Sequence, residues 1–543
     1  MYRDRAGAEY SPLETVYSAN TDLADFLAGP YLPLTDGLFL AADTPTADRI
    51  RARYGARARV IFRPARLVFA AIERRFREAL LHRAKSDLAE NEPQFSAATV
   101  VTKGQASVLL IALLVLFILL AAFPHLFCIA LAWVLIVAFD ANAAFRAFLL
   151  LAGDRPSETE DAVPVATERL PAYSILVPLY REANVMPALA RALRALDYPR
   201  HLLDIKLIVE MDDGDTAAVA DVIASCDDIF SVIRVPPGTP RTKPRACNYA
   251  MPFCWGEFTV VFDAEDRPEP DQLRKAVAKF RALPDSVACL QARLNFYNAR
   301  ENWLTRMFTL DYALWFDYLL PGLDRLNIPM PLGGTSNHFR TKALRTIHGW
   351  DPYNVTEDAD LGIRLARVGL RVRTLDSTTF EEATNNFGNW LRQRSRWLKG
   401  YMQTWLVHMR SPRDLLRNAG IGGFIGFQLF VGGTFLSALA NPVLWGFLAV
   451  SKLFGTSTGF VSLDAATHVS IVGLAVGNGL FAYLAMLGPF RRGWLDLTPY
   501  GLTAPVYWLL ISCAGVRALW QLIRRPYHWD KTTHGICKTG GVA

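Results

Sequence analysis

The chain has 543 residues, a formal net charge of +7 and a hydrophobic fraction of 52%, with the apolar residues gathered in long runs. Its length predicts about three to four domain-sized units. The seven cysteines have no short paired spacing, which argues against a zinc site and a disulfide framework. The basic residues flank apolar runs instead of forming a compact block, so nucleic-acid binding is not expected. The polar, charged N-terminus predicts no signal peptide.

A small α/β domain with a linker is expected over residues 23–104, after a flexible lead of residues 1–22. A hairpin pattern surrounds the turn signal Asp36-Gly37. The expected elements are strands at Tyr31–Leu34, Leu38–Ala41 and Ala58–Phe62, helices at Ala47–Tyr54 and Pro64–Ala79, and a charged linker at 84–104. This order and the Leu-Pro-Leu strand resemble the N-terminal domain of type II secretion and pilus assembly ATPases, some of which bind cyclic di-GMP. That family's repeated nucleotide-binding motif is incomplete here, so the resemblance implies a regulatory or docking module more than a cyclic di-GMP site.

Two groups of apolar segments, in residues 105–150 and 420–525, predict membrane helices. The expected spans are Ala106–Phe123 and Leu126–Phe145, which form a hairpin, and then Phe424–Ala449, His468–Phe490 and Ala504–Leu522. The Asn441-Pro442 pair leaves open whether the third segment is one helix or two. Two helices would place the tail, residues 526–543, in the cytoplasm and the basic pair Arg491-Arg492 outside, whereas one helix would reverse both placements.

The polar region between these groups, residues 151–385, alternates strands and helices in the manner of a parallel sheet with crossover helices. The expected strands are Tyr173–Leu179, Ile205–Glu210, Ser231–Val235 and Phe258–Phe262, and helices are expected at Ala183–Leu196 and Thr216–Ser225. In such sheets ligands bind beyond the carboxyl ends of the strands. The polar residues at those ends are therefore the candidate site residues.

Acidic residues follow three of the four expected strands. They are Glu182 after the first, Asp212 and Asp213 after the second, and Asp263, Glu265 and Asp266 after the fourth. Ordinary loop acidity would explain any one cluster, but carboxylates crowded at one edge repel one another unless a cation binds there. Mg²⁺ or Mn²⁺ carrying a diphosphate fits this pattern, because both ions take oxygen ligands. Lys243 would add a positive charge for phosphate.

Two aromatic segments are expected at the membrane interface. The first, Glu301–Leu320, has few charges and predicts an amphipathic helix at that interface, with a core helix as the alternative. The second, residues 386–419, predicts another interface helix. Between them, the small-residue loop Leu332–His338 would let the backbone approach a ligand closely.

Six motifs occur in an order and spacing that resemble the processive membrane glycosyltransferases of family 2, which include cellulose synthase catalytic subunits and hyaluronan synthases. They are Pro178 to Glu182, Asp212-Asp213-Gly214, Lys243 to Asn248, Asp263-Ala264-Glu265, Thr356-Glu357-Asp358 and Gln393-x-x-Arg396-Trp397. The match covers about residues 105–525 and is strongest toward bacterial exopolysaccharide synthases of the cellulose-synthase-like group. It implies an α/β domain of the GT-A type, inserted in an α-helical multi-span protein of the bacterial inner membrane, with the catalytic domain in the cytoplasm.

The resemblance also implies a role for each motif residue. The implied nucleotide-binding residues are Pro178, Tyr180, Glu182, Asp212, Asp213, Lys243 and Asn248, and the implied metal ligands are Asp263, Glu265 and Asp266. Asp358 is the implied base, beside Thr356 and Glu357, and the acceptor and diphosphate would contact Gln393, Arg396, Trp397, Gly334, Ser336 and His338. The family usually has Asp where this chain has Glu265, so Asp266 is the alternative second ligand. The short tail predicts that the C-terminal β-barrel sensor of cyclic di-GMP-controlled cellulose synthases is absent.

The expected reaction is a single displacement with inversion, in which Asp358 deprotonates the acceptor hydroxyl. A UDP-sugar, by analogy UDP-glucose, would extend a β-linked polysaccharide. The expected partners are this donor, the growing polysaccharide, the lipid bilayer and periplasmic export partners. Two alternatives stay open: transfer of one sugar to a membrane lipid, against which the Gln-x-x-Arg-Trp motif argues, and a silent scaffold or export channel, against which Asp263 and Asp358 together argue.

Overall fold

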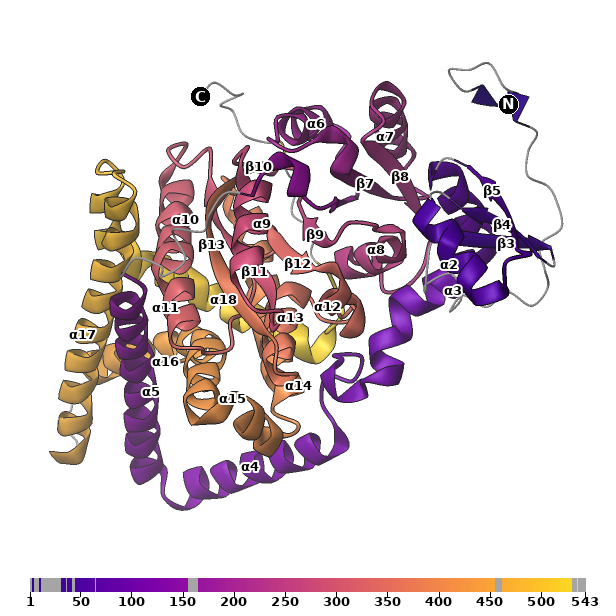
Figure 1. Cartoon of the computed structure of the whole chain (residues 1–543). Coiled ribbons are helices and arrows are strands. Elements are labelled where there is room, and N and C mark those ends of the chain that lie inside the picture. The colour runs from indigo at the N-terminus through magenta and orange to yellow at the C-terminus, as the bar shows by residue number, and fades with distance from the viewer. Residues whose placement is uncertain are drawn as a thin grey trace.

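A central α/β domain lies between a group of long apolar helices and a smaller N-terminal domain (Figure 1). The computed structural model describes residues 2–3, 9–10, 31–35, 37–41, 44–63, 65–154, 165–454, 461–529 and 535. The expected turn residue Asp36, most of the flexible lead and most of the C-terminal tail lie outside these residues. Near the N-terminus, the two-residue strands β1 (Tyr2–Arg3) and β2 (Glu9–Tyr10) pair antiparallel.

The central domain is built on one sheet with the strand order β10-β13-β11-β12-β9-β6-β7-β8. Its strands are β6 (Tyr173–Leu179), β7 (Leu203–Glu210), β8 (Phe230–Val235), β9 (Phe258–Val261), β10 (Arg267–Pro268), β11 (Val287–Phe296), β12 (Asn337–Arg340) and β13 (Arg371–Glu381). The four expected strands and their parallel pairing are confirmed. β12 is antiparallel to both β9 and β11, and β13 is parallel to β11, so β11 and β13 point the same way as β6 to β9. The carboxyl ends of these strands therefore lie along one edge.

Alternating strand residues pack into two cores on opposite faces of the sheet. Ile175 and Val177 of β6 pack with α6 (Met186–Arg194), α7 (Gly214–Cys226) and α9 (Gln272–Ala282). Leu176 packs with α8 (Lys243–Ala250), α12 (Thr341–Thr346) and α13 (Glu357–Arg367) on the other face. Because both faces are covered, the open edge at the strand ends is where a ligand has access.

The N-terminal domain has a three-stranded sheet of β3 (Tyr31–Thr35), β4 (Leu38–Ala41) and β5 (Arg59–Phe62), with helices α2 (Thr44–Tyr54) and α3 (Ala65–Asn91). The expected element order is confirmed, but α3 continues through the first part of the expected linker. Its buried residues Leu80, Ala84 and Leu88 recur at helical spacing, which explains the extension. Asn248 of α8 donates from Nδ2 to the carbonyl of Ala84 at 3.2 Å. The N-terminal domain thus packs on the helix that carries Lys243.

The two aromatic segments are core helices, so the expected position on the membrane surface is wrong. The first forms α10 (Trp303–Leu314), the π-helical turn η5 (Trp315–Leu319) and α11 (Leu320–Arg325), and the second forms α14 (Phe387–His408). Phe308 and Trp390 are fully buried, in a core shared with the long apolar helices. The sequence could not separate the alternatives, because a helix buried among apolar helices and a helix beside lipid have similar composition. The second segment is also interrupted after His408 and resumes at Pro412.

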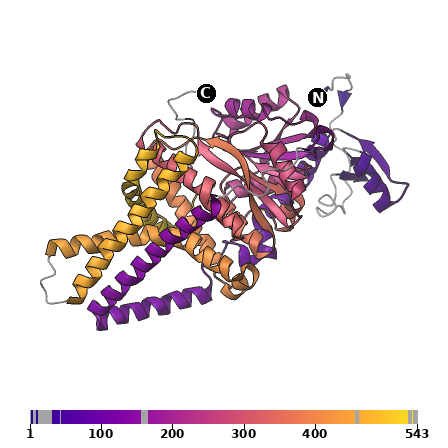
Figure 2. The ribbon, with the colours of Figure 1, turned by 60° about the vertical axis from the view of Figure 1, so that its left-hand side comes forward.

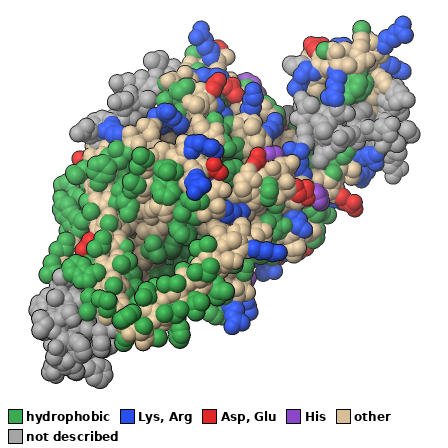
Figure 3. Space-filling view, turned by 90° about the horizontal axis from the view of Figure 1, so that it is seen from below, with side chains coloured by type: hydrophobic (Ala, Val, Ile, Leu, Met, Phe, Trp, Pro, Cys, Tyr) green, Lys and Arg blue, Asp and Glu red, His purple; other side chains and the backbone are tan. Residues whose placement is uncertain are grey.

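Within the described residues, five helices are long and apolar enough to cross a membrane. Two precede the central domain: Lys103–Ala122, which is α4, and Leu126–Gly153, which lies in α5 (Pro124–Gly153). The third, Pro412–Gly446, comprises α15 (Pro412–Phe427), the π-helical turn η6 (Gln428–Gly432) and the first part of α16 (Gly433–Phe454). The last two are Ile471–Arg491, which lies in α17 (Val461–Arg491), and Thr498–Arg524, which comprises η7 (Thr498–Thr503) and α18 (Ala504–Arg524). α16 continues through Pro442, so the expected third segment is one helix. Figures 2 and 3 show α4, α5, α16 and α17 extending from one side of the molecule, where hydrophobic side chains gather and few charged ones appear.

The last apolar helix, α18, lies along α14, and both of its ends contact the central part of the chain. At its start, Trp303 donates from Nε1 to the hydroxyl of Thr503 at 3.0 Å. Just beyond its end, Lys399 donates from Nζ to the carbonyl of His528 at 2.7 Å. The central part of the chain thus holds both ends of α18.

Candidate active site

A cavity of about 440 Å³ lies at the carboxyl ends of the parallel strands and continues to the apolar helices. Residues from every predicted group line it: Pro178, Tyr180, Glu182, Lys243, Asp263, Glu265, Gly334, Thr356, Glu357, Asp358, Gln393, Arg396 and Trp397. Its far end is lined by Arg146 of α5, Thr434 of α16 and Trp508 of α18. The cavity therefore connects the strand ends to the helices that follow and precede the central domain.

Of the three predicted metal ligands, Asp263 and Glu265 line the cavity and Asp266 does not. Asp266 is fully buried, and its Oδ2 accepts from the backbone N–H of Asp263 at 2.7 Å and from the hydroxyl of Thr335. Burial and the neighbouring Asp263 and Glu265 raise the pKa of Asp266 well above its usual value. The role of Asp266 in this structure is to hold the turn that presents the other two carboxylates.

Glu381, at the end of β13, is a further carboxylate of the cavity wall and lies near Asp263 and Glu265. Burial and the nearby Asp266, Glu265 and Asp263 raise the pKa of Glu381 well above its usual value. Within the described part of the chain, no cluster of three His, Cys, Asp or Glu side chains is close enough to hold a metal ion alone. Two facing carboxylates fit Mg²⁺ or Mn²⁺, which are commonly held by one or two carboxylates together with substrate phosphates.

Lys243 stands at the first residue of α8, beside these carboxylates. Its ammonium group contacts Asp263 and donates to the carbonyl of Gly334 at 2.6 Å. Burial disfavours the charged ammonium, but Asp263 and Glu357 outweigh burial and raise the pKa of Lys243. A permanent cation at this place is suited to a phosphate group.

The predicted base lies in the first turn of α13. Asp358 accepts from the backbone N–H of Ala359 at 2.7 Å, and its Oδ2 lies so close to Gly334 that a Cβ there would be 3.2 Å away. Burial raises the pKa of Asp358, and burial together with Asp358 raises the pKa of Glu357 to about 8. The neutral form of Glu357 is therefore favoured near neutral pH.

Gly400 of α14 packs so closely against Thr356 that a larger side chain should disturb the site. A Cβ at Gly400 of α14 would lie 2.1 Å from Oγ1 and 2.7 Å from Cβ of Thr356, so rotation of the threonine cannot relieve the clash. We expect Gly400→Ala to displace the start of α13, to lower thermal stability by roughly 1–3 kcal/mol and to slow transfer. Gly422→Ala is the control, because a Cβ there meets nothing within 4 Å. Equal melting temperatures and rates for the two variants would refute the contact.

The predicted Gln-x-x-Arg-Trp motif lies on one side of α14. Gln393 accepts from the hydroxyl of Thr384 at 3.3 Å, and Trp397 stacks on Tyr312 with ring centroids 6.0 Å apart. The guanidinium of Arg396 lies 4.4 Å from the ring of Trp529, which also lines the cavity. Trp390 is fully buried, and Trp405 donates from Nε1 to Gln428 at 2.8 Å, so these two residues serve helix packing.

Five predicted site residues lie outside the cavity wall besides Asp266. Asp212 forms a 2.5 Å ion pair with Arg241, a wall residue whose Nη1 also donates to the Tyr180 hydroxyl. The remaining four side chains form hydrogen bonds within the protein. Asp213 accepts from the backbone N–H of Thr216 and caps α7, and Asn248 donates to the carbonyls of Ala84 and Trp350. Ser336 donates to the hydroxyl of Thr379, and His338 is hydrogen-bonded to the hydroxyl of Tyr173. Burial lowers the pKa of His338 to about 3, so this imidazole is neutral.

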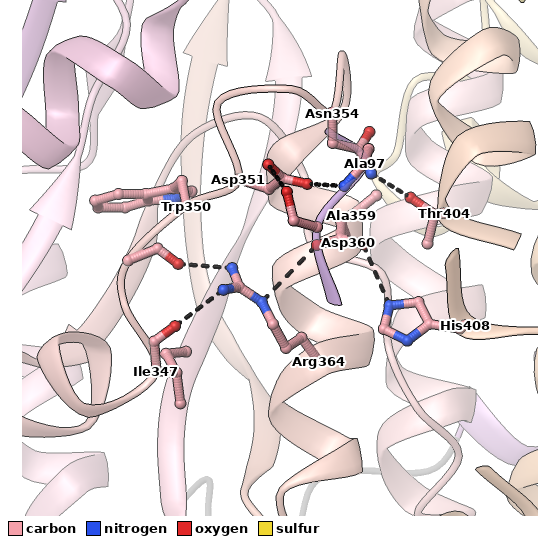
Figure 4. Close-up of polar contacts among 12 residues, drawn as sticks. Ala97, Ile347, Trp350, Asp351, Asn354, Ala359, Asp360, Arg364, Thr404 and His408 are labelled. Carbon is pink, nitrogen blue, oxygen red and sulfur yellow. Dashed lines mark hydrogen bonds and ion pairs between the residues drawn. The ribbon is translucent and has the colours of Figure 1, made fainter. Parts of the chain in front are cut away.

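A buried polar network fixes the back of α13 (Figure 4). Asp360 lies 3.2 Å from Nε2 of His408 on α14, and Arg364 donates to the carbonyl of Ile347 at 2.9 Å. Asp351 accepts from the backbone N–H of Ala97 at 2.5 Å, in the linker that leads to α4. Burial and Asp360 raise the pKa of Asp351 to about 6. The helix that carries Asp358 is thereby tied to α14 and to the linker.

Several wall residues were not predicted. Glu381 is the last residue of β13, a strand that was not predicted, and Arg241 precedes the Lys243 motif by two residues. A search for every strand end and for basic neighbours of each acidic cluster would have found both. Arg146 directly follows the expected membrane span Leu126–Phe145 and belongs to none of the six motifs.

Part of the chain is similar to known glycosyltransferases. Residues 258–512 match the family model described as glycosyl transferase family group 2. The chain is 30% identical over 241 residues to the beta-monoglucosyldiacylglycerol synthase of Trichormus variabilis (44% of this chain, 50% of the relative). It is 28% identical over 248 residues to the probable glucomannan 4-beta-mannosyltransferase 1 of Arabidopsis thaliana (44% of this chain, 45% of the relative). The structure is similar to a mannosyltransferase of Pyrobaculum calidifontis solved with GDP-mannose and Mn²⁺, with a TM-score of 0.48, 17% identity and coverage of 72% of this chain and 99% of that one.

The matched region, residues 258–512, is therefore similar to glycosyltransferases of family 2. The chain spans about half the length of the curated relatives it matches.

Proposed function

We propose that this protein is a membrane-embedded, inverting hexosyltransferase with a GT-A-type domain, which extends a β-linked polysaccharide from a UDP-sugar. The observation that carries the proposal is one continuous cavity whose wall includes Lys243 and Asp263 at the strand ends, Asp358, Trp397 and residues of the apolar helices. The residues proposed to bind the donor, to act as the base and to bind the acceptor thus line the same cavity. We further propose that the bacterial inner membrane holds the protein with its catalytic domain in the cytoplasm.

In this proposal Lys243 binds the donor diphosphate, and Asp358 takes the proton from the acceptor hydroxyl as the bond to the sugar forms. Asp263 and Glu265 would hold Mg²⁺ or Mn²⁺, which when bound supplies positive charge for the departing diphosphate. Arg396 lies one helical turn after Gln393 in α14 and assists in binding the diphosphate. Trp397 offers an aromatic face to a pyranose ring.

Transfer of one hexose to a membrane lipid is the second candidate. Similarity to a beta-monoglucosyldiacylglycerol synthase favours it, as does the continuation of the cavity to α5, α16 and α18. The Gln-x-x-Arg-Trp motif on the cavity wall favours synthesis of a polymer, because this motif is typical of the processive glycosyltransferases that the chain resembles.

The deciding experiment incubates membranes containing the full chain with Mg²⁺ or Mn²⁺ and radiolabelled UDP- and GDP-hexoses. Label is counted separately in ethanol-insoluble polymer and in organic extract. Polymer from one donor supports the proposal and identifies the sugar, whereas label in the lipid fraction alone supports the second candidate. No label and no released nucleotide would refute both.

The contacts of α18 predict the membrane topology. If α4, α5, α16 and α17 cross and α18 does not, then Arg491-Arg492 and the tail lie on the catalytic side, as the positive-inside rule requires. We expect Leu495→Cys to be labelled by an impermeant thiol reagent only from that side, and Ser457→Cys, between α16 and α17, only from the other. The native cysteines are replaced in both variants. Labelling of both from one side would contradict this topology.

A further inference from the structure

Arg146 is a buried cation at the membrane end of the cavity. It lies in the last third of α5, and its side chain is 3% exposed. Its Nε donates to Asn142 at 3.1 Å and its Nη2 to the hydroxyl of Thr434 at 3.0 Å. Four aromatic rings, of Trp315, Phe430, Phe481 and Trp508, surround the guanidinium at 5.7–6.0 Å.

No carboxylate forms an ion pair with Arg146 anywhere in the described residues. The nearby wall residue Asp311 is already paired with Arg394 at 2.7 Å. Nη1 of Arg146 has no hydrogen-bond partner among the residues that the structure describes, although the side chain lines the cavity. An unpaired charge is costly inside a membrane protein, and such residues usually mark a binding site.

The structure assigns to Arg146, Asn142 and Thr434 a subsite for a phosphate group on the acceptor. This assignment rests on the proposed hexosyl transfer, because it treats the part of the cavity beside Arg146 as the acceptor side, and it favours the lipid acceptor of the second candidate, since an unmodified polysaccharide carries no phosphate. Asn142 and Thr434 hold the guanidinium in place, and its free edge supplies donors to the phosphate oxygens. The planar fork of arginine matches phosphate geometry.

The surroundings favour an anion over a neutral sugar hydroxyl. A hydroxyl would satisfy one donor but would bring no negative charge, so the guanidinium would be compensated only by its cation–π contacts with the four aromatic rings. A phosphate would satisfy the donor and compensate the charge. Trp315 and Trp508, which also line the cavity, would pack against the carbon atoms next to the phosphate. The phosphate could be a lipid headgroup or part of a soluble phosphorylated acceptor.

The test measures ligand-induced thermal stabilisation of the full chain in phosphatidylcholine nanodiscs. The probes are dioleoyl phosphatidic acid, dioleoylglycerol, which lacks only the phosphate, and inorganic phosphate. The variants are Arg146→Gln, Thr434→Val and, as a control for general attraction to anionic lipid, the exposed Arg413→Gln. UDP release without added acceptor and the melting temperature without probe report whether each variant is folded.

We expect phosphatidic acid to stabilise the wild type and Arg413→Gln while dioleoylglycerol does not. Arg146→Gln should weaken the apparent affinity about tenfold or more, and Thr434→Val should weaken it less. Stabilisation by inorganic phosphate alone, lost in Arg146→Gln, would keep the subsite and identify a soluble source. Equal responses to the two lipids, or an unchanged response in Arg146→Gln, would overturn the subsite. The proposed function fails separately, if the wild type turns over no nucleotide sugar.

Discussion

Asp358→Asn should abolish sugar transfer, with a loss of about 10²–10⁴-fold, while nucleotide-sugar binding persists. Asn has nearly the same shape as Asp but cannot accept the proton of the acceptor hydroxyl. The pKa of Asp358 is raised above its ordinary value of 3.8, so the wild-type rate should fall with decreasing pH at a point above 3.8. The measurements are the initial rate of label incorporation across pH and donor binding by calorimetry.

Glu357→Gln is the matched control, one residue away in the same turn. Because burial and Asp358 raise the pKa of Glu357 to about 8, the neutral form of this carboxyl group is favoured at pH 7, and that form resembles Gln in shape and charge. We expect Glu357→Gln to retain most activity at pH 7. A large loss in Glu357→Gln together with little loss in Asp358→Asn would reverse the roles of the two carboxylates.

The elements and site residues that could be predicted from the sequence are those marked by a short, continuous sequence pattern. Strands β6 to β9 follow from their apolar runs, and Asp263, Glu265 and Asp358 follow from motifs that lie directly at strand or helix ends. Long-range pairing was not accessible in this way. Glu381 reaches the cavity only because β13 pairs with β11, which is distant in sequence. Likewise, composition cannot show that α14 is covered by α18 instead of lipid.

Long-range contacts also explain why some predicted site residues do not line the cavity. Asp266 and Asp263 are three residues apart in one motif, and a sequence cannot show which carboxylate turns inward. In the structure a backbone N–H and the hydroxyl of Thr335 bind Asp266, so it points away from the cavity. Asn248 is similar, because its partners Ala84 and Trp350 come from a different domain and a distant loop.

Replacing Asp263 by Asn should raise the Mn²⁺ or Mg²⁺ concentration needed for half-maximal transfer by at least tenfold and should lower the maximal rate. Asp263 faces the cavity beside Lys243, whereas Asn would offer a weaker, neutral oxygen to a divalent cation. Glu265→Gln should act in the same direction. Activity is measured as released UDP over a metal titration after chelator treatment.

Asp266→Asn decides which carboxylates serve the metal. Burial and the neighbouring Asp263 and Glu265 raise the pKa of Asp266 well above its usual value and so favour its neutral form, which Asn resembles, and Asn keeps an oxygen for the N–H of Asp263. We therefore expect a metal requirement close to that of the wild type, with any cost appearing in thermal stability. If Asp266→Asn shifted the metal requirement as strongly as Asp263→Asn while Glu265→Gln did not, Asp266 would be the second ligand and the turn would have to rearrange when metal binds. The comparison of these three variants thus separates a carboxylate that binds a cation from one that holds the turn.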